Sequence, residues 1–309
     1  MIITTCPGEV HNGVWRHLKE LEGSTGITKH VDTEILLKNI PNDTKLIISG
    51  GGWINKYQQL NTIAISNNIK SGLLYCSPFG QTDLCNEHGS LKQAINLLMF
   101  GQIDYLFTGE EYMAEFLRNK LKTDKVLWLP QTIDYKEINL DESTKDGNKL
   151  GLFCNSNPNK NILNQVVAAS VVGKKLVTNA LTTIMSSIAN EFSVDYEMTG
   201  WLNDEEYLKK MVSVDVGLQV SWSESFDYVA AEMSLRGIPV VTGKTISWNH
   251  PELIVDNNDD AEEISIKLKK AFNQLKTNDK YKEDVRANII KELDCRSKIA
   301  KENLEKVLK

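Results

Sequence analysis

One stretch constrains the fold more than any other, because a strand, a polar loop, a helix and a second strand follow one another in it. The apolar run Val214–Val220 predicts a buried strand, and the segment from Asp227 to Gly237 predicts a helix that the glycine ends. Pro239–Val241 predicts the next strand. A helix between two strands is typical of a parallel sheet, in which each connection has to cross back along the sheet.

The same alternation extends along the chain and predicts the α/β class. The polar segment 136–148 has no hydrophobic periodicity and predicts a linker. We therefore expect a Rossmann-like N-terminal domain at 1–135, a second at 149–290, and a last helix at 291–309. Predicted strands of the first half are Ile2–Thr5, Leu46–Ser49, Leu73–Cys76, Tyr105–Thr108 and Val126–Leu129. Predicted helices include Gly13–Leu21, Leu91–Phe100, Tyr112–Leu121 and one that runs from Pro158 to Val172.

Two glutamates eight residues apart suggest a binding site. Glu224 lies in the polar loop and Glu232 inside the helix. Eight helical residues rise about 12 Å and rotate by about 80°, so both carboxylates can face one cleft at different heights. This suits a long ligand such as a nucleotide sugar, whose diphosphate would lie at the helix N-terminus. The alternative is an amphipathic helix with two solvated glutamates.

The stretch resembles the donor-site signature of the retaining GT-B glycosyltransferases of family 4, roughly Pro-Ser-x-x-Glu-x-Phe-Gly-x4-Glu-Ala-x-Ala-x-Gly-x-Pro-Val-Val. The sequence departs from it at Val220 in place of Pro, Asp227 in place of Gly and Met233 in place of Ala. A carboxylate at position 227 would repel a diphosphate unless it points away or caps the helix, and Asp is a good N-cap. The residues in register are Ser221, Glu224, Phe226, Glu232, Gly237, Pro239, Val240 and Val241.

The resemblance covers about residues 100–135 and 149–275. It includes Gly200–Lys210, Ile103–Leu117 and Leu129–Asp134. It implies two Rossmann-like domains whose parallel sheets face a cleft, and a C-terminal helix that crosses back to the N-terminal domain.

The resemblance also implies roles for residues of the second domain. Glu224 would contact the transferred sugar and Glu232 would accept the ribose hydroxyls. Lys160 would neutralise the diphosphate, although Asn155 stands where the family has an arginine. A solvated lysine at a helix end is the alternative for Lys160. The donor diphosphate would also contact the backbone of Ser225, Phe226 and Asp227.

Candidates in the first domain are less specific. Gly13 belongs to a glycine-containing turn of the kind that approaches the donor in the family, and plain turn chemistry is the alternative. Gly51 and Gly52 allow close backbone approach, and Trp53 could stack on a sugar or a base. His11 and His88 lie in loops and are acceptor-side candidates, although a lone histidine is more often structural.

Composition narrows the class of partner. The net charge is −6 and no long basic block is present, which weakens the case for a nucleic-acid partner. No apolar run approaches the length of a membrane span, and five cysteines without Cys-x-x-Cys spacing indicate reduced thiols in a cytoplasmic protein. No Asp-x-Asp motif or His/Cys cluster is present, so no metal site is expected.

The resemblance implies a retaining hexosyltransferase with no cofactor, and the lack of metal-binding motifs favours one that needs no metal. Its donor would be a nucleotide sugar such as a UDP-sugar, and a saccharide is the favoured hydroxyl acceptor. Two alternatives stay open. One is a transferase that glycosylates a modified DNA base, and the other is a non-transferring or epimerase-like protein that binds nucleotide sugars.

Overall fold

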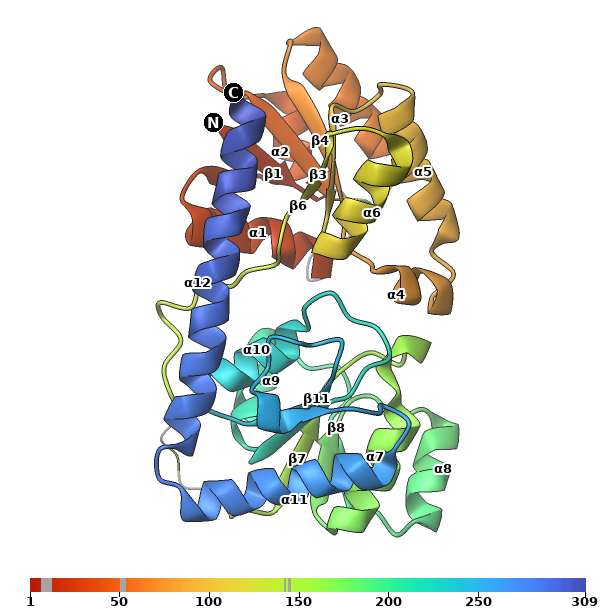
Figure 1. Ribbon diagram of the computed structural model, residues 1–309, viewed down its shortest axis with the longest axis vertical. Helices are drawn as coiled ribbons and strands as arrows, with labels where there is room; N and C mark the ends of the chain where they lie inside the picture. The colour runs from red at the N-terminus through yellow and green to blue at the C-terminus, as the bar shows by residue number, and fades with distance from the viewer. Residues whose placement is uncertain (7–12, 51–53, 142, 144–145) are drawn as a thin grey trace. The chain divides into compact units, whose positions relative to one another are not determined.

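The computed structural model describes residues 1–6, 13–50, 54–141, 143 and 146–309. The chain forms two compact units, residues 1–134 with 293–309, and residues 135–292 (Figure 1). Each unit contains one six-stranded parallel sheet flanked by helices, which confirms the predicted α/β class.

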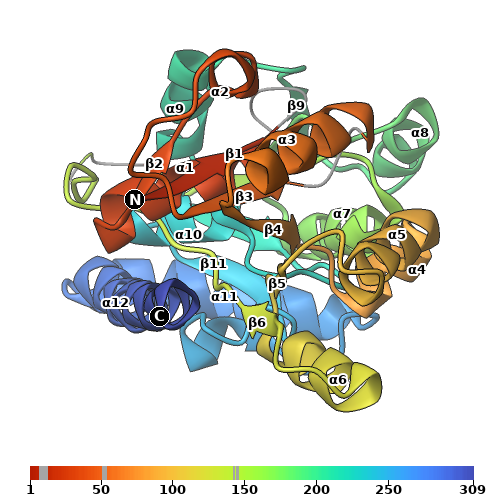
Figure 2. The same ribbon diagram turned by 90° about the horizontal axis from the view of Figure 1, so that it is seen from above.

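The first sheet has the strand order β2-β1-β3-β4-β5-β6, which can be followed from above in Figure 2. The strand order reverses at β1, which pairs in parallel with both β2 and β3. The strands are β1 (Ile2–Thr5), β2 (Thr28–His30), β3 (Leu46–Gly50), β4 (Lys70–Tyr75), β5 (Tyr105–Thr108) and β6 (Val126–Trp128). The helices are α1 (Gly13–Thr25), α2 (Thr33–Lys38), α3 (Ile54–Ser66), α4 (Phe79–Leu84), α5 (His88–Met99) and α6 (Glu111–Leu121).

Alternation along the strands explains how both faces of this sheet are covered. Ile2 faces the helices α1 and α12 (Tyr281–Leu308), whereas its neighbour Ile3 faces α2 and α3. The last turns of α12 contribute Ala300 and Leu304 to the first core. The C-terminal helix therefore packs on the N-terminal sheet, as predicted.

The sequence reading found the apolar strands and missed two short elements. β2 is Thr-Lys-His, which carries no hydrophobic pattern, and α2 has only six residues, too few to show a helical period. The start predicted for the helix at Pro158 is wrong. Pro158–Lys160 forms a 3-10 turn, and Asn161 adopts φ +50° before the helix begins at Ile162. Asparagine tolerates this left-handed backbone and competes with helix hydrogen bonding.

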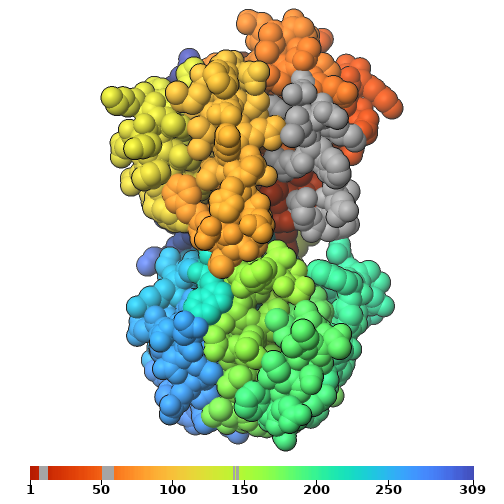
Figure 3. Space-filling model, turned by 90° about the vertical axis from the view of Figure 1, so that its right-hand side faces the viewer, coloured from red at the N-terminus to blue at the C-terminus, as the bar shows by residue number. Residues whose placement is uncertain are grey.

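The second sheet has the strand order β12-β11-β10-β7-β8-β9. Its strands are β7 (Lys149–Leu152), β8 (Lys175–Thr178), β9 (Tyr196–Met198), β10 (Val216–Gln219), β11 (Val240–Gly243) and β12 (Ile254–Val255). The helices are α7 (Ile162–Val172), α8 (Thr183–Glu191), α9 (Asp204–Val212), α10 (Tyr228–Leu235) and α11 (Ala261–Thr277). Figure 3 shows α8, in green, on the surface of this unit.

Two glycines allow α10 to approach the second sheet closely. A Cβ atom added at Gly151 in β7 or at Gly217 in β10 would lie 3.4 Å or 2.8 Å from the nearest atom of the Met233 side chain. Met233 is fully buried and lies where the family signature has alanine. The glycines therefore make room for the larger side chain, and the helix that carries Glu232 keeps a close position on the sheet.

Among the described residues, each helix is too short or too polar to cross a membrane.

Candidate functional site

The second sheet has a point at which its strand order reverses. β7 pairs with β8 on one side and with β10 on the other, with Gly151 opposite Gly217. The chain leaves β7 through α7 for β8 on one side of this pair, and it leaves β10 through α10 for β11 on the other side. In open α/β sheets, ligands bind at the carboxyl ends of the strands at such a point. The loops that follow β7 and β10 are therefore the expected place for a site.

Hydrogen bonds with two asparagines hold the loop after β10. The Asn159 side chain donates to the Ser223 carbonyl over 2.9 Å, and the Trp222 amide donates to the Asn159 carbonyl over 2.7 Å. Asn258 donates to the Ser221 carbonyl over 2.8 Å. Each bond ties this loop to another segment of the unit, so the position of the glutamate that follows Ser223 is fixed.

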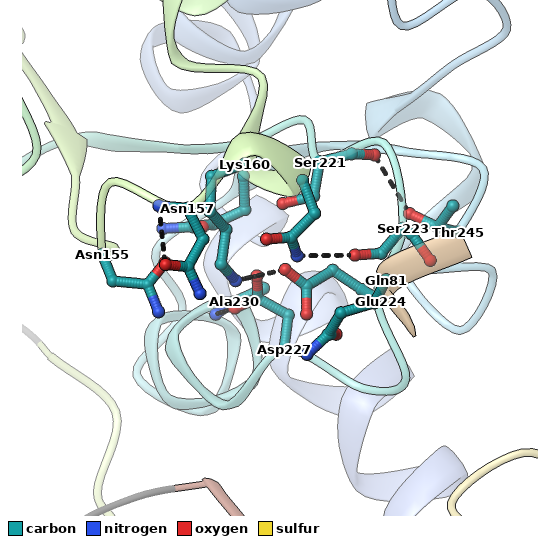
Figure 4. A network of polar contacts seen from close by, with 12 residues as sticks. Gln81, Asn155, Asn157, Lys160, Ser221, Ser223, Glu224, Asp227, Ala230 and Thr245 are labelled. Atoms are coloured by element: carbon teal, nitrogen blue, oxygen red, sulfur yellow. Dashed lines mark hydrogen bonds and ion pairs between the residues drawn. The ribbon is translucent and has the colours of Figure 1, made fainter. Parts of the chain in front are cut away.

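Three charged side chains meet between the two loops (Figure 4). Lys160 ends the 3-10 turn after β7, and its Nζ donates a hydrogen bond to Oε1 of Glu224. The same Nζ lies 3.9 Å from Oδ2 of Asp227. The side chains of Lys160, Glu224 and Asp227 are 15%, 8% and 2% exposed. One buried cation thus serves two buried carboxylates.

Asp227 occupies the position before α10 with φ +66° and ψ +89°. This left-handed backbone accounts for the glycine of the family signature, and aspartate is one of the few other residues that tolerate it. Its Oδ1 accepts a hydrogen bond of 2.9 Å from the Ala230 amide and caps the helix, which is one of the two arrangements that the sequence left open. Its Oδ2 is buried and has no hydrogen-bond partner among the residues that the structure describes.

Burial governs the ionisation of this cluster. It raises the pKa of Asp227 to about 6, although Lys160 opposes the rise and Glu224 adds to it. Burial disfavours the charged ammonium of Lys160, but Glu224 and Asp227 outweigh it and raise the Lys160 pKa above its ordinary value. The neighbouring Cys154 is kept as a neutral thiol because burial raises its pKa to about 12.

Glu232 has a partner that the sequence analysis missed. The Tyr207 hydroxyl, on α9, donates a hydrogen bond of 3.2 Å to Oε2 of Glu232. The Tyr207 ring in turn packs edge-on against Phe153, which follows β7. A tyrosine in a charged helix gives no local signal of this contact, because the contact depends on how α9 and α10 pack.

A second missed residue is Trp201. It lies between β9 and α9, close after the carboxyl end of β9, and its side chain is 82% exposed. An indole with this exposure presents a flat aromatic face to solvent and suits stacking on a flat ligand. The Gly-Trp pair in a polar turn was the available signal.

The other predicted site residues are placed as follows. The Phe226 ring is buried between Tyr228 and Trp248, so only its backbone could contact a ligand. Ser225 is half-buried in the same loop. Gly13 begins α1, where an added Cβ would meet open space. His11, Gly51, Gly52 and Trp53 lie outside the described residues.

The prediction that His88 lies in a loop is wrong. His88 is the first residue of α5. It is exposed, and its Nε2 lies 3.0 Å from Oδ1 of Asp83. The helix starts three residues earlier than predicted, because the turn Cys85–Glu87 closes on the preceding short helix.

A metal centre is not evident in the part of the chain that the structure describes. No three side chains of His, Cys, Asp or Glu gather there in a way that could hold an ion.

Comparison with known proteins identifies the fold. No protein-family model matches the sequence, and no curated protein matches it significantly. Solved structures do match. A Staphylococcus aureus TarM variant, in complex with fondaparinux, α-GlcNAc-glycerol and UDP, is 12% identical with a TM-score of 0.67. The match covers 89% of this chain and 58% of TarM, so the chain spans less than two thirds of that protein.

Two other structures match along nearly their whole length. An Escherichia coli structure described as trehalose-6-phosphate bound with UDP-2-fluoro glucose is 11% identical, with a TM-score of 0.68 and coverage of 100% of this chain and 99% of the other. A glycosyltransferase from Rickettsia africae is 13% identical, with a TM-score of 0.68 and coverage of 100% and 98%. The fold is GT-B. At these identities the likeness establishes the fold alone.

Proposed function

We propose that the protein is a glycosyltransferase that takes a sugar from a nucleotide-sugar donor held by residues 135–292. The observation that carries the proposal is the meeting of Lys160, Glu224 and the N-terminus of α10 at the reversal point of the second sheet. The similar TarM structure contains UDP, and the similar E. coli structure contains UDP-2-fluoro glucose. A UDP-sugar is therefore the first donor to test.

The proposed donor lies along α10. Glu232 lies more than one helical turn beyond the N-terminus of α10. Its carboxylate would accept hydrogen bonds from the ribose hydroxyls, and the hydrogen bond from Tyr207 orients that carboxylate. Glu224 would accept hydroxyls of the transferred sugar from its fixed loop. Because Glu224 already accepts from Lys160, donor binding would draw the Lys160 ammonium from the carboxylates toward the diphosphate.

The chemistry we assign to Lys160 is stabilisation of the leaving group. Negative charge grows on the diphosphate as the bond to the sugar breaks, and a buried ammonium stabilises that charge more in the transition state than in the ground state. We propose that the reaction retains configuration, needs no metal, and uses the leaving phosphate to accept the proton of a saccharide hydroxyl.

The first test is a thermal-shift screen of nucleotide sugars against the whole chain. A donor at 100 times its Kd should stabilise the protein by about 2.7 kcal/mol. Lys160→Ala should reduce the shift, whereas Lys209→Ala should not, because Lys209 pairs with Glu205 on the exposed side of α9. A screen in which no nucleotide sugar shifts the melting temperature would refute the proposal. Donor breakdown without transfer, or epimerisation of its sugar, would instead favour the non-transferring alternative.

A further inference from the structure

The charges of the donor site do not balance once a diphosphate is added. Lys160 contributes one positive charge, and Glu224 and Asp227 contribute two negative ones, which leaves a net charge of −1. Asn155, at the start of the same loop, supplies no second cation. A diphosphate diester carries two negative charges, so the occupied site would reach −3. Buried groups do not support such an excess of one sign.

Asp227 is the carboxylate least able to keep its charge in that complex. It is the more buried of the two, and no described residue forms a hydrogen bond with its Oδ2. Its nearest cation, Lys160, lies 3.9 Å away and bonds to Glu224 instead. If the ammonium turns to the diphosphate, Oδ2 keeps no counter-charge, while Oδ1 still accepts from the Ala230 amide.

We infer that Asp227 takes up one proton when the donor binds, so that a neutral carboxyl at the N-terminus of α10 replaces the second basic side chain of the family pattern. The inference rests on the proposed function, because it requires a diphosphate in this site. A proton passes from solvent to Oδ2 and no other bond is made or broken. The new O–H can donate a hydrogen bond to the nearest anion, and the occupied site then carries −2.

The groups that face Asp227 are consistent with this role. They are Lys160 from the 3-10 turn, Glu224 from the loop after β10, and the neutral Cys154 thiol after β7. Burial already raises the Asp227 pKa to about 6 without a ligand, and the diphosphate has to raise it well above 7 for the carboxyl to be fully protonated at neutral pH. Donor affinity should then fall about tenfold for each pH unit between the pKa of Asp227 in the free protein and its pKa in the complex.

The test is isothermal titration calorimetry with UDP-glucose in two buffers of different ionisation enthalpy. The diphosphate of UDP-glucose is esterified at both ends and does not itself titrate near neutral pH. At about pH 7, a group with a pKa of about 6 is about nine-tenths ionised, so binding should take up about 0.9 proton. Asp227→Asn keeps a cap acceptor and should abolish both the uptake and the pH dependence.

The matched control is Asp32→Asn, the same change at a helix N-cap of the other unit, which should leave the uptake unchanged. Binding without proton uptake, or equal uptake in wild type and Asp227→Asn, would overturn the inference and leave the proposed function standing. Failure to bind any nucleotide sugar would refute the proposed function itself. If the Asn variant does not fold, Asp227→Gly serves, because glycine adopts φ +66° without strain.

Discussion

Replacing Lys160 by methionine should make stability depend on pH in a defined way. Methionine keeps the volume of the aliphatic chain and removes the charge, so Glu224 and Asp227 lose their shared cation while 8% and 2% exposed. Removing one partner of a buried ion pair costs about 3–5 kcal/mol. Because water reaches Lys160, which is 15% exposed, we expect the lower end, about 3 kcal/mol at neutral pH.

The sign of the pH effect follows from Asp227. Its pKa in the folded state is raised by burial and held down by Lys160, so without Lys160 it lies further above the pKa of the unfolded chain, and the folded state binds a proton more tightly than the unfolded state. The contribution of this protonation to the free energy of unfolding of the variant is fully present below the unfolded-state pKa of about 4. It is lost as the pH rises through the folded-state pKa. The deficit of Lys160→Met should therefore be small near about pH 4 and reach its full size near about pH 8.

Urea unfolding of wild type and variant across that pH range measures the deficit directly. Lys209→Met is the control, since its pair with Glu205 is exposed and worth about 0.3–0.5 kcal/mol. Adding Glu224→Gln to Lys160→Met removes one uncompensated charge and should recover on the order of 1–2 kcal/mol. A deficit that is the same at every pH, or no larger than that of Lys209→Met, would refute the buried ion-pair reasoning.

Three further outcomes are expected. Glu232→Gln should raise the donor KM about tenfold or more, since a hydrogen bond to a charged group is worth about 1.5–3 kcal/mol. The control is Glu205→Gln, which changes an exposed side chain of α9. An unchanged donor KM in Glu232→Gln would contradict the ribose role. Trp201→Ala should weaken the binding of UDP by about 1–3 kcal/mol, because we expect the exposed indole to stack on the base. An unchanged affinity for UDP in calorimetry would contradict this stacking. Transfer activity should survive EDTA, and complete loss that Mg²⁺ or Mn²⁺ restores would argue against leaving-group stabilisation by Lys160 alone.

The outlines of the fold could be predicted from the sequence because they depend on local pattern. The run Ile2–Thr5 and the run Tyr105–Thr108 are buried strands with the predicted bounds. Asp227 caps its helix because the carboxylate of an aspartate at this position can accept a hydrogen bond from a free backbone amide of the first turn. The strand β2 has no hydrophobic pattern and the helix α2 is only six residues long, so neither gave such a signal.

The amino-acid sequence by itself determined the α/β class, the helix of Glu232 and the residue types of the site, since each follows from neighbours within a few positions. Only the tertiary structure decided that Lys160 bonds to Glu224, 64 residues away, because that contact requires β10 to pair beside β7. The same holds for the bond from Tyr207 to Glu232, which depends on the packing of two helices. Sequence separation says nothing of which strands become neighbours; the burial of apolar surface across the whole sheet does.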